Sequence, residues 1–298
     1  MEHLVGSSMP KTDVLSTRQV AQLLGVGEAT VKRWADAGEI ECFRTPGGHR
    51  KFRLRDVTAF VQGRKFEVQG TLPARLSSDA SEEEGAAVSE FETSALAGDA
   101  SGCVAQLAAH RLRGESLAAI FDDVVAPALV SIGQRWQLAS LSVAEEHIGS
   151  QAVIDAIARA QPLAEPPGEP NRAVRGAAVV AAVAGEMHDI AARMVACLLR
   201  ARGFEVLAPL AQTPARDLAD LVLRCRASIV ALSSTVPRDL AELSEQVGMA
   251  ARAAGQSGGR VVLGGVGMAN VPLPEGAELL RSMRDLEAHV GGARPQRH

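Results

Sequence analysis

The feature that most constrains the fold lies in the C-terminal part of the chain, where short apolar runs alternate with amphipathic stretches. The apolar runs occupy 177–184, 204–210, 228–234 and 260–265, and helical apolar spacing fills the intervals between them. Strands that are covered on both faces have such continuous apolar runs, and helices commonly connect parallel strands. The sequence therefore predicts an α/β domain with a doubly wound parallel sheet within residues 175–298.

Two stretches of small, polar and charged residues divide the rest of the chain. We interpret residues 67–88 and 166–174 as linkers, because they contain little that could be buried and the second is rich in Pro. Between them, residues 89–165 repeat apolar positions at three- and four-residue spacing, which predicts four helices. Helices of this length can close into a four-helix bundle, and Pro127 is expected to kink the third helix.

The N-terminal part, residues 13–66, has the spacing of a helix-turn-helix and follows a tail at 1–12 that we expect to be disordered. Gly25 marks the turn, and a second helix is expected to begin near Glu28 with Val31 facing inward. In such a motif the second helix enters the major groove of DNA. This part is therefore predicted to be a DNA-binding domain.

A basic hairpin follows the helix-turn-helix. Residues 45–48 form a predicted tight turn between two short strands. Cations surround this turn: Arg44, Arg50, Lys51, Arg53 and Arg55. Clustered cations beside a helix-turn-helix can bind DNA phosphates, although the net charge of the whole chain is −4. A charged hairpin that contacts only solvent is the alternative interpretation.

The pattern R-T-x-G-G-H-R-x-[FY] runs through this hairpin from Arg44 to Phe52. With it, residues 14–62 resemble the winged helix-turn-helix domain of the MerR family. The resemblance implies that operator double-stranded DNA is a partner. The implied DNA-binding residues lie on the recognition helix and on the wing: Thr30, Lys32, Arg33, Arg44, His49, Arg50 and Lys51.

Polar residues and glycines follow three of the predicted strands of the C-terminal domain. His188 follows the first strand, Ser233–Thr235 the third and Gly264–Gly265 the fourth. In an open parallel sheet, ligands bind at the carboxyl ends of the strands. A loop histidine can offer one ring nitrogen to a metal while Glu186 holds the other, and paired glycines leave room for a bulky group. A solvated loop histidine is the alternative.

Together these residues resemble the cobalamin-binding Rossmann module over about 175–292, with its pattern D-x-H-x-x-G, S-x-T and G-G. The resemblance implies that His188 is the lower axial cobalt ligand. Ser233, Thr235 and the two glycines would line the path of the cofactor's nucleotide tail. The implied cofactor-binding residues of this domain are Glu186, His188, Asp189, Ile190, Ser233, Thr235, Gly264 and Gly265. Glu186 stands where the pattern has Asp, and Ala191 stands where it has Gly.

Trp136 is followed after nine residues by Glu146 and His147, at the predicted junction of the third and fourth bundle helices. A Trp buried in the bundle, with Glu and His on a polar helix face, is the alternative to a ligand site. The W-x9-E-H motif and the order of the three domains resemble the CarH/LitR light-dependent repressors. The resemblance implies that the cofactor is adenosylcobalamin and that these three residues enclose its adenosyl group.

The resemblance also implies a mechanism of regulation. In the dark, the cofactor-bound chain would be a homo-oligomer, a tetramer, that binds operator DNA. Light would release the adenosyl group, and the tetramer would then dissociate and release the DNA. One residue departs from the pattern, because Gln137 stands where the family has a His that ligates cobalt after photolysis. We predict that this chain does not trap a bis-histidine photoproduct in the usual way.

Two alternatives to a cobalamin-dependent photoreceptor are open. The departures Glu186, Ala191 and Gln137 would also fit a regulator that senses another cobalamin, another tetrapyrrole or no ligand. Corrinoid carrier subunits of enzymes share the helical cap and the Rossmann module. The MerR-like domain argues against that class, and no catalytic nucleophile or base is evident, so we expect a regulator and not an enzyme.

Composition favours a cytoplasmic protein without a membrane partner. No apolar run in the sequence reaches the roughly 20 residues that span a bilayer, and residues 1–10 lack a signal pattern. The four cysteines show no C-x-x-C spacing, which indicates neither a disulfide framework nor a zinc site.

Overall fold

The computed structural model describes residues 14–23, 26–45, 47–53, 56–57, 60, 79–164, 174–236 and 238–291. The chain divides into two compact units, Met1–Arg75 and Leu76–His298, and each is described here by itself. The predicted tail 1–12, most of the linker 166–174, Gly25 and Arg55 lie outside the described residues.

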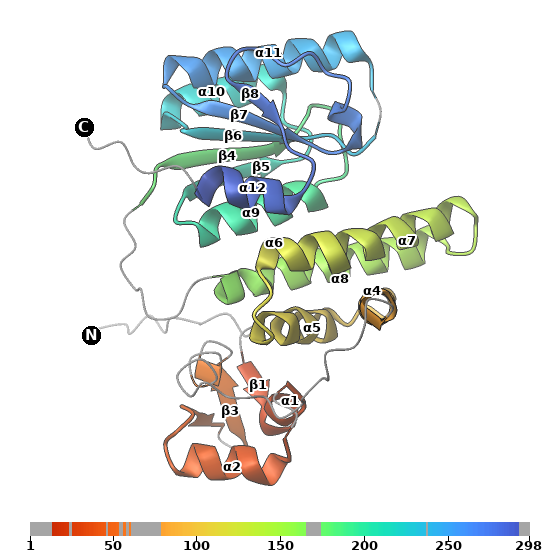
Figure 1. Ribbon diagram of the computed structural model, residues 1–298, viewed down its shortest axis with the longest axis vertical. Helices are drawn as coiled ribbons and strands as arrows, with labels where there is room; N and C mark the ends of the chain where they lie inside the picture. The colour runs from red at the N-terminus through yellow and green to blue at the C-terminus, as the bar shows by residue number, and fades with distance from the viewer. Residues whose placement is uncertain are drawn as a thin grey trace, which may run out of the picture. The chain divides into compact units, whose positions relative to one another are not determined.

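The N-terminal unit is a helix-turn-helix with a small antiparallel sheet (Figure 1). Its elements are β1 (Val14–Ser16), α1 (Thr17–Leu23), α2 (Glu28–Asp36), β2 (Phe43–Arg44) and β3 (Arg50–Arg53). Val31, Trp34 and Phe52 are buried between α2 and the sheet. The predicted start of the second helix and the hairpin are therefore confirmed. Strand β1, which pairs with β3, was not predicted, because a three-residue strand has too little pattern of its own.

The next part of the chain is a bundle of helices, as predicted. Its elements are α4 (Asp79–Leu96), α5 (Ala100–Leu112), α6 (Leu117–Ile120), the π-helical η1 (Phe121–Val125), α7 (Ala126–Gln137) and α8 (Val143–Ala164). Helix α4 begins at Asp79, so the prediction of a linker over 67–88 is wrong for its last ten residues. Ala and Glu are frequent there, and both are strong helix formers.

The third rod of the bundle runs continuously through α6, η1 and α7. Pro127 is the second residue of α7, just beyond the π-helical turn, and an irregular turn is a place where a helix can accommodate a residue without an amide hydrogen. This rod, Leu117–Gln137, is also long and apolar enough to cross a membrane by length and composition alone. Phe121, Val124 and Ile132 are buried within the unit. Helices in the cores of other proteins can be as long and as apolar.

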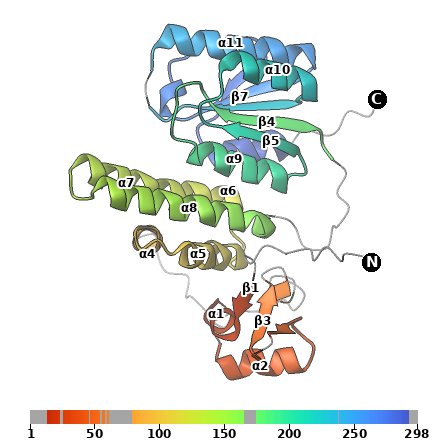
Figure 2. The same cartoon turned by 180° about the vertical axis from the view of Figure 1, so that it is seen from behind.

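The C-terminal part is a five-stranded parallel sheet with helices on both faces (Figures 1 and 2). The strands are β4 (Ala177–Ala182), β5 (Glu205–Leu210), β6 (Ile229–Ser233), β7 (Arg260–Gly264) and β8 (Ala277–Leu279). Their order is β5-β4-β6-β7-β8, so the chain reverses direction across the sheet between β4 and β6. The predicted doubly wound fold is confirmed, and the short edge strand β8 was not predicted.

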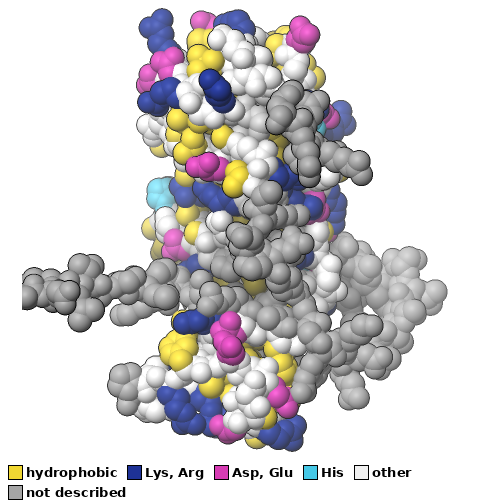
Figure 3. Space-filling view, turned by 90° about the vertical axis from the view of Figure 1, so that its left-hand side faces the viewer, with side chains coloured by type: hydrophobic (Ala, Val, Ile, Leu, Met, Phe, Trp, Pro, Cys, Tyr) yellow, Lys and Arg dark blue, Asp and Glu magenta, His cyan; other side chains and the backbone are white. Residues whose placement is uncertain are grey.

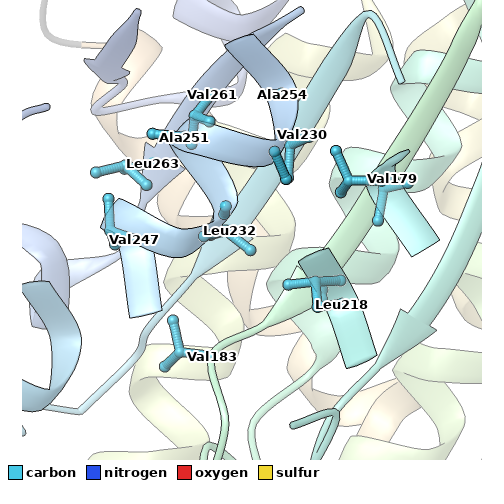
Figure 4. Close-up of a cluster of buried hydrophobic side chains, with 14 of the residues drawn as sticks. Val179, Val183, Leu218, Val230, Leu232, Val247, Ala251, Ala254, Val261 and Leu263 are labelled. Carbon is cyan, nitrogen blue, oxygen red and sulfur yellow. The ribbon is translucent and has the colours of Figure 1, made fainter. Parts of the chain in front are cut away.

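Two helices cover each face of the sheet. The helices of this part are α9 (Ile190–Ala201), α10 (Ala215–Cys225), α11 (Leu240–Gln256), the short 3-10 helix η2 (Val266–Met268) and α12 (Met283–Gly291). Helices α10 and α11 pack on one face, where Leu218 and Val247 meet Val230 and Leu232 of β6 (Figure 4). Helices α9 and α12 cover the other face, which also faces the bundle.

The bundle and the sheet domain, predicted as separate domains, form one compact unit. Helix α8 packs along α9, and α6 and η1 contact α12. The thiol of Cys197 on α9 lies 4.0 Å from the carbonyl oxygen of Ile157 on α8, and burial raises the pKa of that thiol to about 12. The apolar faces of these helices are therefore shared between the two parts.

Candidate functional site

A buried carboxylate organises the loop after β4. Glu186 is fully buried, with no exposed side-chain surface. Its Oε1 accepts hydrogen bonds from the amides of Met187 and His188, and its Oε2 accepts them from the amides of Thr235 and Val236 after β6. Burial alone would raise the pKa of Glu186, but these hydrogen bonds and that of the His188 ring outweigh it and lower the pKa to about 2. Glu186 therefore stays ionised and joins two loops of the sheet.

The same carboxylate orients His188. Nδ1 of His188 lies 2.6 Å from Oε1 of Glu186, and because an ionised carboxylate can only accept, Nδ1 donates. In the neutral imidazole the other ring nitrogen, Nε2, then carries the lone pair, and 60% of the side chain is exposed. This is the arrangement in which an outer carboxylate prepares a histidine to bind a metal. The predicted pairing of Glu186 with His188 is present in the structure.

The ends of β6 and β7 line a cavity of about 220 Å³ that lies between the sheet and helices α9 and α12. Ser233 and Gly264 line it, together with Ala191 at the start of α9. The hydroxyl of Ser233 is buried and has no hydrogen-bond partner among the residues that the structure describes. A Cβ at Gly264 would meet nothing closer than the Leu280 carbonyl oxygen at 3.9 Å, so this glycine leaves free space rather than avoiding a clash.

Other predicted residues of the domain have structural roles beside the cavity. Gly265 has φ +91°, and a Cβ there would collide with the carbonyl of Ser234. Asp189 precedes α9 and binds Arg193 through both carboxylate oxygens, while Ile190 begins the helix. The side chain of Thr235 is exposed, and its amide is held by the carboxylate described above.

The α7–α8 junction carries the predicted W-x9-E-H residues. Trp136 is 46% exposed, so it is not a buried core residue of the bundle. Glu146 accepts a hydrogen bond from the Ser150 hydroxyl at 2.6 Å, and its other oxygen lies 3.6 Å from Nε2 of the exposed His147. This junction and the carboxyl edge of the sheet lie on the same side of the unit in both views (Figures 1 and 2).

The basic surface of the N-terminal unit surrounds α2 and the wing. Lys and Arg side chains gather at the end of the unit where α2 lies (Figure 3). Lys32, Arg33, Arg44 and His49 are exposed, while Thr30 and Lys51 are half-buried. Arg50 donates to Asp36 of α2 at 2.5 Å and only 17% of its side chain is exposed. Arg50 therefore holds the β2–β3 hairpin, the predicted wing, against α2, the predicted recognition helix.

Some residues near the site were not predicted from the sequence. The guanidinium of Arg238 binds the carbonyl of Gly185, and Oε1 of Gln246 accepts from the amide of Ala184 at 2.9 Å. Both contacts support the β4 loop from elements more than 50 residues away, so no local pattern reveals them. Among the described residues, no cluster of three or more His, Cys, Asp or Glu could hold a metal ion alone.

Three known families account for most of the described chain. Residues 14–65 match a helix-turn-helix domain, and residues 88–161 and 176–273 each match a B12 binding domain. The chain is 29% identical over 250 residues to the HTH-type transcriptional repressor CarH of Myxococcus xanthus, a match that covers 76% of this chain and 80% of CarH. The chain is a transcriptional regulator that binds B12, and these matches support a regulator of the CarH type. It is thus a regulator rather than an enzyme, as predicted, and the predicted fold class is confirmed.

A further relative and a solved structure of similar fold cover parts of the chain. The transcriptional repressor DcmR of Methylorubrum extorquens is 42% identical over 50 residues, which are 16% of this chain and 19% of DcmR. The structure of the Methanosarcina barkeri monomethylamine corrinoid protein has a similar fold, with a TM-score of 0.54 at 12% identity. That match covers 69% of this chain and 97% of the corrinoid protein.

The residues present fit a cobalamin. A corrin ring supplies the equatorial ligands of cobalt itself, so a single imidazole nitrogen, Nε2 of His188, is enough on the protein side. The hydroxyl of Ser233, which has no partner in the described part of the chain, offers a hydrogen bond in the cavity that Gly264 and Ala191 also line. A cavity of about 150 Å³ can hold benzene, so this cavity has room for an aromatic base of the tail.

The dependence of both loops on Glu186 can be tested with Glu186→Gln. An amide NH2 at either carboxylate position would face N–H donors and leave buried groups without hydrogen bonds. This should lower the free energy of unfolding by about 1–3 kcal/mol. We expect the amides of His188 and Thr235 to exchange hydrogen faster and the chain to unfold at lower denaturant concentration. The matched control is Glu205→Gln, at the exposed start of β5, which should change stability by no more than about 0.5 kcal/mol. Equal protection of the loop amides in Glu186→Gln and the wild type would show that the carboxylate does not hold them.

Proposed function

We propose that this chain binds adenosylcobalamin through His188 and that the bound cofactor controls its binding to operator DNA, as a light-responsive repressor. The observation that carries the proposal is the His188 ring, oriented by the buried Glu186 at the point where the strand order reverses. In doubly wound folds this is where ligands bind. The B12 binding domain that covers residues 176–273 supports the same placement.

The lower side of the cofactor would rest on the β4, β6 and β7 loops. Nε2 of His188 would coordinate cobalt, and the tail would enter the cavity where Ser233 and Gly264 lie. Thr235 and Gly265 would contact the tail near the mouth of the cavity. Asp189 and Ile190 would lie under the corrin edge, since they follow His188 directly.

The upper side would be covered by the α7–α8 junction. Adenosylcobalamin supplies a cobalt–carbon bond that light cleaves. The exposed indole of Trp136 would pack against the adenosyl group, and Glu146 and His147 would bind its polar atoms. Exposed aromatic surface beside a polar pair suits a nucleoside, which has an apolar face and hydroxyl edges.

The N-terminal unit would bind the operator. Lys32 and Arg33 of α2 are exposed for the major groove, and Arg44, His49 and Lys51 lie on the wing. Arg50 would act through Asp36 by holding the wing against α2. The likeness to CarH and DcmR supports repression and a location in the cytoplasm, where operator DNA is accessible. A single N-terminal unit would bind DNA weakly, so joining several of these units in a tetramer would raise the avidity without new contacts.

A second candidate is a regulator that responds to cofactor level rather than to light. Gln137, an exposed residue at the end of α7, favours it, because an amide is a poorer cobalt ligand than the imidazole of the family. Both candidates share the lower face of the site, so they differ only in what light does.

Size-exclusion chromatography of the full chain tests the proposal and separates the two candidates. With adenosylcobalamin in the dark we expect a larger assembly that binds operator DNA. Illumination should return the chain to a smaller species with weaker DNA binding. Assembly that forms with the cofactor but survives illumination would contradict the light response and support the second candidate. An elution volume that the cofactor never changes would contradict both.

The role of the α7–α8 junction can be tested with Trp136→Ala. Loss of a central aromatic contact costs about 2 kcal/mol, or roughly 30-fold in affinity. We expect this loss for adenosylcobalamin and little change for methylcobalamin, measured by absorbance titration in the dark. Leu138→Ala is the control, because Leu138 is also exposed two residues away. Equal losses for the two cobalamins would contradict the assignment of Trp136 to the adenosyl group.

A further inference from the structure

The π-helical turn η1 places two acidic residues against the sheet domain. Asp122 and Asp123 stand within an otherwise apolar stretch of the third bundle rod. The carboxylate of Asp122, 16% exposed, accepts hydrogen bonds from the amides of Met283 at 2.8 Å and Arg284 at 3.0 Å in the first turn of α12. Asp123 binds the guanidinium of Arg284 through both of its oxygens, with one bond of 2.7 Å. We call these contacts between Asp122, Asp123 and α12 the η1–α12 latch.

The latch satisfies groups that would otherwise be exposed at a helix end. The amides of the first helical turn have no partner within the helix, and a carboxylate there also benefits from the helix dipole. Helix α12 has a local cap as well, since Ser282 and Asp285 bond each other's amides. The helix can therefore persist without Asp122, so the latch serves to attach the bundle rather than to form α12.

The same elements close the cavity between the sheet and helices α9 and α12. Ser233 and Gly264 line it from the sheet, and Met283 lines it from α12. Asp122 and Ala126 line it from the bundle. One wall of the candidate tail cavity thus belongs to the bundle, and this wall is fastened to the sheet domain by the η1–α12 latch.

From this geometry we infer that the η1–α12 latch couples docking of the bundle to the nucleotide tail, so that the chain distinguishes complete cobalamins from corrinoids without a tail. A group in the cavity contacts both the bundle and the sheet domain only when they are docked. Such a ligand binds the docked arrangement more tightly and shifts the population toward it. The inference rests on the proposed function. It adds that docking of the bundle requires the nucleotide tail at the lower side of the site.

The test compares adenosylcobalamin with adenosylcobinamide, which carries the same upper group but no nucleotide tail. Both are added in the dark to the full chain at saturation, which absorbance confirms. Hydrogen exchange then reports the amides of Met283 and Arg284 and those of η1. We expect adenosylcobalamin to slow their exchange by about 5- to 150-fold, the range of typical coupling energies. Adenosylcobinamide should leave them as in the chain without ligand.

A matched pair of variants separates the latch from simple loss of tail contacts. Asp122→Ala should bind adenosylcobinamide as the wild type does but lose most of its preference for adenosylcobalamin and the protection at α12. Asp217→Ala is the control, because Asp217 is also in the first turn of a helix but on the opposite face of the sheet. It should retain both the preference and the protection.

The possible failures are distinguishable. If neither corrinoid changes the absorbance, the proposed function fails and the inference falls with it. If both bind and protect the α12 amides equally, or if Asp122→Ala keeps the wild-type preference, the latch does not sense the tail while cobalamin binding stands.

Discussion

The candidate site depends on one buried carboxylate. Glu186 is ionised although its side chain is fully buried, which is favourable only because amides from two loops and an imidazole satisfy it. Removing any of these partners would leave a buried charge short of hydrogen bonds. The position of the His188 ring and the closure of the β6 loop against β4 are therefore parts of a single interaction. A ligand that binds at this edge of the sheet would therefore find the His188 ring already oriented by Glu186.

The topology explains why that interaction can serve a regulator. The strand order reverses between β4 and β6, so their loops diverge and leave a cavity that reaches down between the sheet and α12. The bundle supplies part of the wall of this cavity through Asp122 and also extends on the side of the carboxyl edge. One cofactor could thus touch the bundle at two places, which is what a ligand needs to bias how the domains dock.

Features with local patterns could be predicted from the sequence, and features made by distant pairing could not. The apolar runs predicted four of the five strands, and the spacing of Glu186 and His188 predicted their pairing. The short strands β1 and β8 exist only because a neighbouring strand binds them. The bonds from Glu186 to the β6 loop join residues about 50 positions apart. Asp122 and Asp123 were visible as two charges in an apolar helix, but nothing local indicated their partner on α12.

The measurement that tests the central claim most directly is an absorbance titration of the full chain with adenosylcobalamin in the dark. The wild type should give a saturable change to the spectrum of a cobalamin with imidazole as its lower ligand. His188→Ala should lose that change, while His49→Ala, altered in the separate N-terminal unit, should keep it. The same imidazole-ligated spectrum in His188→Ala would contradict the account, because another residue would then hold the cobalt.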